Sequence, residues 1–205
     1  MKRKVSNPLA LAVLALLVER ATHPYDMART MRERGHEESI KLNYGSLYTV
    51  LEQLLRAGFV AVRETIRESA RPERTIYEIT DAGRSELHDW MAELVSTPAK
   101  EFRTFEAALA LLGVLAPDEA RRLLEVRRVR LGVRMAEQRA AIDALVAGGL
   151  DPFFLIENEY RLALETAERA FVEQLLRTLD DERLLQMWRG FHQESAEERE
   201  KGRKQ

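Results

Sequence analysis

Short polar side chains recur on one side of the segment 43–59, at the spacing of an α-helix. Ser46, Thr49, Gln53 and Arg56 form this polar face. The opposite face is apolar and consists of Leu47, Val50, Leu51, Leu54 and Leu55, which predicts a helix with one buried side. Hydroxyl, amide and guanidinium groups form hydrogen bonds with base edges and phosphates. The polar face therefore has the chemistry needed to contact duplex DNA.

A second group of basic residues lies between two strand-like runs. Residues 59–66 and 75–79 alternate and are rich in β-formers, and the intervening turn contains Pro72, which excludes a two-residue turn. Arg67, Arg71 and Arg74 gather around this turn. A cationic hairpin tip of this kind can lie along a phosphate backbone.

The neighbouring segments predict the elements that position these two groups. Asn43 is a helix cap and Gly58 a left-handed helix end, so the polar helix spans the residues between them. Two helices precede it, over residues 8–18 and from Pro24 to near Gly35, each opened by a cap and a proline. A fourth helix begins after Thr80 and carries the apolar residues Leu87, Trp90, Met91, Leu94 and Val95.

This order of elements is typical of a winged helix-turn-helix. Residues on the flank of the polar helix and in the linker before it are added to these two groups. Tyr44 and Tyr48 lie on the flank, where a tyrosine ring can pack at its base and direct its hydroxyl outward. The predicted DNA contacts are Lys41, Asn43, Tyr44, Ser46, Tyr48, Thr49, Gln53, Arg56, Arg67, Arg71 and Arg74.

Composition limits the alternatives. The chain has 205 residues, 45% of them hydrophobic, and a net charge of −2, so it can bury a substantial core. The absence of cysteine excludes disulfides and thiolate chemistry and fits a reducing cytoplasm. Residues 1–96 contain as many acidic as basic side chains, so DNA binding would depend on where charges lie. The apolar run after the basic amino terminus is too short to span a bilayer, and we expect no membrane association.

Residues 97–205 predict a helical domain whose apolar surface exceeds what one helical hairpin covers. A long helix is expected from 118 to 146 and another after Asp151-Pro152. We expect these helices to pair with a second copy of the chain, the alternative being an intramolecular bundle without a dimer. The predicted dimer contacts are Leu124, Leu131, Met135, Ile142, Phe153, Ile156, Tyr160, Ala163, Ala167 and Phe171.

Catalytic and cofactor chemistry find little support. The histidines His23, His36, His88 and His192 are scattered, and none has metal-ligand or base–nucleophile spacing. We expect no cofactor, no metal and no enzymatic activity. Aromatic residues could line an effector pocket between subunits, although at helical spacing they more often form core. These aromatic residues are Trp90, Phe102, Phe105, Tyr160 and Trp188, and the sequence identifies no ligand.

Five segments in order resemble the PadR-type transcriptional regulators. They are Leu9–Leu17, His23-Pro24-Tyr25-Asp26, Tyr44-Gly45-Ser46-Leu47-Tyr48, Leu54–Val60 and Tyr77–Arg84. The longer carboxy-terminal half resembles that of the family's larger, virulence-activator-type members. Thr49 stands where many members have proline, and the wing lacks the family's common glycine.

The resemblance implies a bacterial, dimeric repressor, and it completes the interpretation of the sequence. We expect a mainly α-helical chain with a small β-hairpin wing. Residues 1–96 would form a winged helix-turn-helix DNA-binding domain, and residues 97–205 a helical dimerisation and effector-sensing domain. The dimer would bind double-stranded DNA at a near-palindromic operator in the cytoplasm. The remaining alternative is a protein-docking or ligand-sensing module that acts through a protein partner without DNA.

Overall fold

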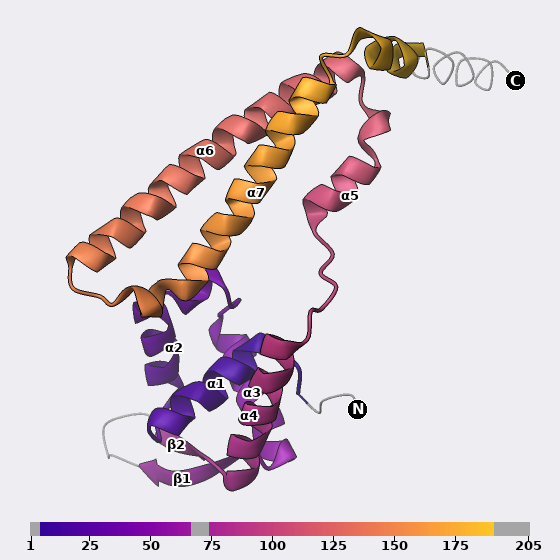
Figure 1. Cartoon of the computed structure of the whole chain (residues 1–205). Helices are drawn as coiled ribbons and strands as arrows, with labels where there is room; N and C mark the ends of the chain where they lie inside the picture. The colour runs from indigo at the N-terminus through magenta and orange to yellow at the C-terminus, as the bar shows by residue number, and fades with distance from the viewer. Residues whose placement is uncertain (1–4, 67–73, 191–205) are drawn as a thin grey trace, which may run out of the picture. The chain divides into compact units, whose positions relative to one another are not determined.

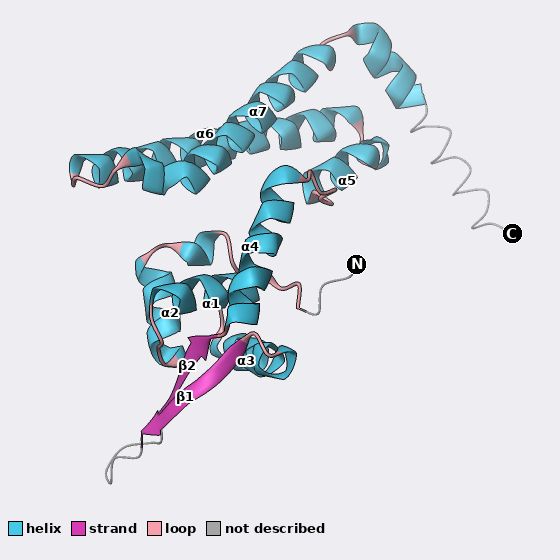
Figure 2. Cartoon of the chain, turned by 60° about the horizontal axis from the view of Figure 1, so that its bottom comes forward, coloured by secondary structure: helices cyan, strands magenta, loops and turns pink. Residues whose placement is uncertain are grey.

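The computed structural model describes residues 5–66 and 74–190. The chain divides after Lys100 into two compact units. Figure 1 shows the order of the elements and Figure 2 their secondary structure. The chain is mainly helical, and its described strands form one antiparallel hairpin. The predicted fold class is therefore confirmed.

The first unit is built around α1 (Pro8–Glu19), which contacts the other helices of the unit and the hairpin. Those helices are α2 (Pro24–Glu33), α3 (Tyr44–Ala57) and α4 (Asp81–Ser96), and a short 3-10 turn covers His36–Glu38. Strand β1 (Val60–Ile66) pairs with β2 (Arg74–Ile79), with a register irregularity between Val62 and Glu64. Leu9, Val13 and Leu14 of α1 are fully buried, which explains the uninterrupted apolar run in the sequence.

Local capping fixes where the first helices begin. The Asn7 side chain accepts a hydrogen bond from the Leu9 backbone N–H at 2.9 Å. His23 Nδ1 accepts from the Tyr25 backbone N–H at 3.1 Å. Each cap precedes a proline at the first helical position, as the sequence predicts.

Thr80 joins the end of α3 to the start of α4. Its hydroxyl donates to the Gly58 carbonyl at 2.7 Å and accepts from the Gly83 N–H at 3.0 Å, while its own N–H donates to the Phe59 carbonyl at 3.1 Å. One residue therefore fixes the carboxy-terminal end of α3 relative to the base of the hairpin.

We expect Thr80→Val to lower the free energy of unfolding by about 1–2 kcal/mol, because both hydroxyl hydrogen bonds are lost while the shape is kept. Urea denaturation measures the change. Thr65→Val is the control, since Thr65 lies on the exposed side of β1. Equal losses in the two variants would mean that the Thr80 hydroxyl contributes nothing specific.

The fourth helix begins after Thr80 as predicted, and only part of its apolar residues is buried. Trp90 is buried and Leu87 is partly buried, but Met91, Leu94 and Val95 are exposed. The apolar residues of α4 continue past Trp90, the last residue of the helix that the core of the unit buries.

The second unit is dominated by two long helices, α6 (Pro117–Ala147) and α7 (Ile156–Thr178), which lie side by side in both views (Figures 1 and 2). Helix α5 (Thr104–Ala110) and a 3-10 turn (Leu112–Val114) precede them, a second 3-10 turn (Pro152–Leu155) opens α7, and residues 182–190 are helical.

Ion pairs connect α6 to the acidic residues of α7 along the hairpin. Arg127 pairs with Glu168 at 2.6 Å, Arg139 with Glu159 at 3.2 Å, and Arg134 with the buried Glu165. Two apolar clusters flank these ion pairs along the hairpin, one formed by Leu124 with Val172 and Leu176, the other by Ile142 with Leu155 and Leu162. Apolar packing supplies most of the stability, and the ion pairs favour this register of the two helices.

Candidate nucleic-acid interface

Helix α3 is held rigidly at both ends. The Asn43 side chain accepts a hydrogen bond from the Ser46 backbone N–H at 2.7 Å, and Gly58 ends the helix with φ of 77°. The face made by Leu47, Val50, Leu51 and Leu54 is buried in the core of the first unit. The side chain of Asn43 is thus engaged in positioning the helix.

The predicted polar face of α3 lies on the surface. Thr49, Gln53 and Arg56 are exposed, whereas Ser46 is half-buried. The Thr49 hydroxyl donates to the Gly45 carbonyl at 3.0 Å, and Arg56 Nε donates to the Glu52 carbonyl at 3.3 Å. The Thr49 oxygen remains an acceptor, and the terminal nitrogens of Arg56 remain donors for an external group.

Tyr44 at the amino-terminal end of α3 is supported by two residues of α2. Arg32 Nη1 donates to the Tyr44 hydroxyl at 3.1 Å, and the guanidinium carbon lies 5.0 Å from the ring centroid. The Tyr25 ring stacks on Tyr44 with centroids 6.4 Å apart. The hydrogen bond that Arg32 donates to the Tyr44 hydroxyl is the main cause that raises the pKa of Arg32, and Glu37 raises it further. The guanidinium therefore stays charged beside the exposed aromatic pair.

Sequence reasoning missed Tyr25 and Arg32 as parts of this surface. Tyr25 belongs to one of the family-like segments, and this was the available signal; Arg32 gave none, because only the packing of α2 on α3 brings it to Tyr44.

Tyr48 lies further along α3, exposed and close to the hairpin. Burial raises the pKa of the Tyr77 hydroxyl on β2, and the neighbouring Tyr48 and Glu52 raise it further. Tyr77 is also joined to Thr22 by two backbone hydrogen bonds of 3.0 and 3.1 Å. A neutral Tyr77 thus lies where β2, the α1–α2 link and α3 meet.

The basic residues outside α3 are described only in part. Lys41 is exposed, just before the helix. Arg67 and Arg71 lie outside the described residues, and Arg74 is described by its backbone, as the first residue of β2 opposite Ile66. Arg63 is exposed on β1 at the register irregularity, and sequence analysis did not single it out.

Comparison with known proteins identifies this arrangement. Residues 13–89 match the Transcriptional regulator PadR-like family. The first unit is a PadR-like domain. The match covers α2, α3, the hairpin and most of α4, including the exposed polar face of α3.

One relative, the negative transcriptional regulator PadR of Bacillus subtilis, is 26% identical over 140 residues, which cover 68% of this chain and 75% of the relative. Crystal structures of that protein in complex with operator DNA and with p-coumaric acid have TM-scores of 0.67 and 0.68, each at 21% identity, covering 84% of this chain and 99% of theirs. The Vibrio cholerae virulence activator AphA has a TM-score of 0.60 at 19% identity, covering 84% of this chain and 98% of its own.

These likenesses extend the shared fold beyond the PadR-like domain into the second unit. Together with the family match, they confirm the resemblance drawn from the sequence, including the likeness to larger members with a virulence-activator-like helical half.

The predicted dimer contacts of the second unit fall into two groups. Leu124, Leu131 and Ile142 are buried within the single chain and Met135 packs against this core. Leu124 and Ile142 pack against α7, and in the single chain the three buried residues have little surface left for a partner. Their assignment to a dimer interface stays a prediction.

The second group lies on the outer side of α7 and of the turn before it. Its six residues, all exposed, are Phe153, Ile156, Tyr160, Ala163, Ala167 and Phe171. Ile156 is 55% exposed and Tyr160 is 62% exposed. Steps of three and four residues place this group on one continuous side of the helix.

The aromatic residues predicted to line an effector pocket also differ in whether they are buried or exposed. Trp90 is part of the core of the PadR-like domain, Trp188 packs on the Leu124 cluster, and Phe102 is exposed. Phe105 lines a hollow within the second unit.

Across residues 5–66 and 74–190, no three His, Asp or Glu side chains come together in a way that could hold a metal ion. In the same residues, no helix combines the length and apolar character that crossing a membrane requires.

Proposed function

We propose that this chain is a DNA-binding transcriptional regulator that reads its operator with α3. The observation that carries the proposal is the capped, core-anchored α3 with an exposed polar face beside an antiparallel hairpin, within a PadR-like domain. A helix of this kind enters the major groove with its amino-terminal part toward the bases, while the wing follows flanking phosphates.

Each residue of the interface has a distinct role in this proposal. Thr49 and Gln53 contact base edges, because their side chains are short, exposed and able to form specific hydrogen bonds. Arg56 and Lys41 contact phosphates. Asn43 positions the helix by capping it. Tyr44 and Tyr48 supply aromatic surface and a hydroxyl at the rim of the contact.

The regulator is proposed to act as a homodimer through the exposed stripe of α7. Water-exposed aromatic and aliphatic side chains in a continuous row are costly for a monomer and typical of an interface. A twofold arrangement of two α3 helices would require two half-sites about one helical turn apart, and hence a near-palindromic operator.

The sign of regulation and the effector response are taken from the relative. The Bacillus subtilis protein is a negative regulator and its crystal structures hold operator DNA and p-coumaric acid. By analogy, we propose repression in the bacterial cytoplasm, relieved by a small molecule, with no catalytic role for this chain.

Selection of bound fragments from random genomic DNA, followed by footprinting, tests the proposal. The expected result is a set of fragments that share one near-palindromic sequence, with protection on successive major-groove faces. No retention at low salt would instead favour a protein-docking module, and retention without any shared sequence would mean that α3 does not read base sequence.

A separate prediction concerns how the arginines of the wing affect DNA affinity and its dependence on salt. We expect Arg71→Ala and Arg74→Ala to weaken binding to all DNA sequences and to lower the slope of log K against log salt by roughly one unit per lost phosphate contact. Gln53→Ala is the contrasting variant, since it should change sequence preference and leave the slope unaltered. Unchanged slopes in both arginine variants would remove the wing from the interface.

A further inference from the structure

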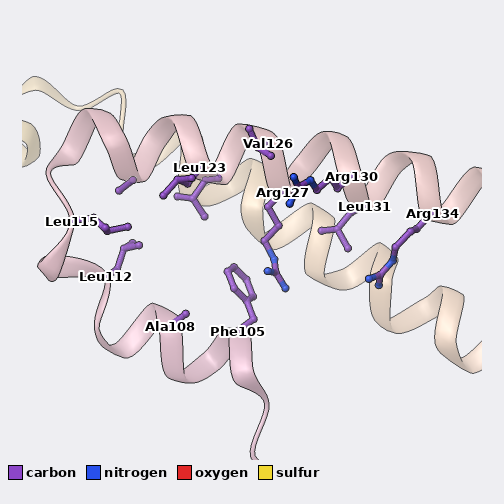
Figure 3. A pocket seen from close by; sticks show the side chains of 12 residues that line it. Phe105, Ala108, Leu112, Leu115, Leu123, Val126, Arg127, Arg130, Leu131 and Arg134 are labelled. Atoms are coloured by element: carbon purple, nitrogen blue, oxygen red, sulfur yellow. The ribbon is translucent and has the colours of Figure 1, made fainter.

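A hollow of about 440 Å³ lies within the second unit, between α5 with its following 3-10 turn and the first half of α6 (Figure 3). Its volume is in the range of small-molecule sites in proteins. All of its lining comes from residues 105–134, so the pocket belongs to this unit alone.

The wall of the hollow is mostly apolar. Phe105, Leu112 and Leu115 line it from the α5 side, and Leu123 and Leu131 line it from α6. Such a surface favours a ligand with an apolar body, since transfer of that body from water is favourable.

The polar part of the lining is entirely cationic among the described residues. Arg127, Arg130 and Arg134 follow one another on α6 at steps of three and four residues, and no acidic side chain joins them in the lining. This asymmetry distinguishes the hollow from a packing defect in an apolar core, which would have no charge of either sign nearby.

Two of the three arginines are already engaged. Arg127 pairs with Glu168 at 2.6 Å, and its guanidinium carbon lies 3.6 Å from the Phe105 ring centroid, which explains why the two side chains face each other in Figure 3. Arg134 pairs with Glu165. Within the described residues Arg130 has no ion-pair partner.

We propose that this pocket binds a small monoanion with a largely apolar body. Arg130 meets the anionic group, and the leucines with Phe105 contact the body. One uncommitted guanidinium matches one negative charge, because Arg127 and Arg134 are already neutralised by their acidic partners. This inference rests on the proposed function, because it gives the proposed effector response a binding site and a class of ligand.

The position of the pocket along the chain gives the ligand a route to regulation. Helix α5 supplies Phe105 and Ala108 to the wall, and residues 97–103 join α5 directly to α4 of the PadR-like domain. A ligand that contacts both α5 and α6 would restrict α5, and with it the segment that connects the two units.

Fluorescence titration of the full chain without DNA tests the proposal, using two probes that differ only in charge. The anionic probe is 1-anilinonaphthalene-8-sulfonate, and the neutral one is N-phenyl-1-naphthylamine. We expect Arg130→Met to weaken the sulfonate probe roughly tenfold, the loss of one charge-assisted contact, and to leave the neutral probe unchanged. Arg122→Met is the matched control, because Arg122 is exposed on α6 outside the lining.

A second variant fills the hollow. Ala108→Trp should abolish binding of both probes at this site, with an unchanged circular dichroism spectrum as the folding control. Equal weakening by Arg130→Met and Arg122→Met, or probe binding that neither Arg130→Met nor Ala108→Trp affects, would overturn the proposal. Because no DNA is present, failure here would leave the proposed operator binding intact, and loss of operator binding would leave this titration unaffected.

Discussion

Replacing Gly83 by alanine is expected to lower the free energy of unfolding of the PadR-like domain by about 3 kcal/mol, at the upper end for overpacking a core. A Cβ at Gly83 would lie 2.1 Å from the Phe59 carbonyl oxygen and 2.9 Å from Ile79 Cγ1. The carbonyl cannot simply move, since it accepts the Thr80 N–H at 3.1 Å. The start of α4 can approach the base of the hairpin only where no side chain intervenes.

Urea denaturation followed by tryptophan fluorescence measures this effect. Trp90 reports on the PadR-like domain once Trp188 is replaced by phenylalanine, because Trp90 is buried in its core. Gly45→Ala is the control, since its Cβ would meet only Asn43 Oδ1, at an ordinary 3.6 Å. If the Gly83 and Gly45 variants unfold at the same urea concentration, the close approach at Gly83 is not as tight as the geometry requires.

The PadR-like domain was predictable from the sequence because its boundaries depend on local chemistry. Asn43, Gly58 and Thr80 act within a few residues of themselves, as caps and as a left-handed helix end, and the structure places each in that role. The apolar stripe of α3 also followed from spacing alone. Nothing in these inferences required knowledge of which segments meet in space.

The features that the sequence did not predict depend on contacts between segments that are distant in the chain. Spacing marked both Leu131 and Tyr160 as apolar helix positions, but it could not tell which of them the neighbouring helix covers. In the structure Leu131 on α6 is buried, whereas Tyr160 on α7 is exposed. The support of Tyr44 by Arg32 and the pocket beside Arg127 depend in the same way on how helices pack, which no local pattern specifies.

The second large expected effect is that of substitutions in the exposed stripe of α7 on dimer formation. If the proposed dimer forms through this stripe, we expect Ile156→Glu combined with Tyr160→Glu to raise its dissociation constant by roughly 100-fold or more, because each carboxylate would have to be desolvated in the interface without a partner. Both side chains are more than half exposed in the single chain, at 55% and 62%. The fold of the unit itself should therefore persist.

Analytical ultracentrifugation over a range of protein concentrations measures the dissociation constant. Thr166→Glu adds a negative charge of the same kind, one in place of two, at an exposed position of α7 outside the stripe, so it should leave the dimer intact. If the double variant and this control sediment as the same species as the unmodified protein, the stripe does not form the interface.

Loss of the dimer would also separate binding to a single half-site from binding to the full operator. A monomer keeps α3 and its polar face, so its affinity for an isolated half-site should be unchanged. Its affinity for the full operator should fall toward that half-site value, because the second half-site is no longer bound through the same molecule. A footprint that shrinks from two half-sites to one in the double variant, and remains complete in Thr166→Glu, would assign operator spacing to the outer face of α7.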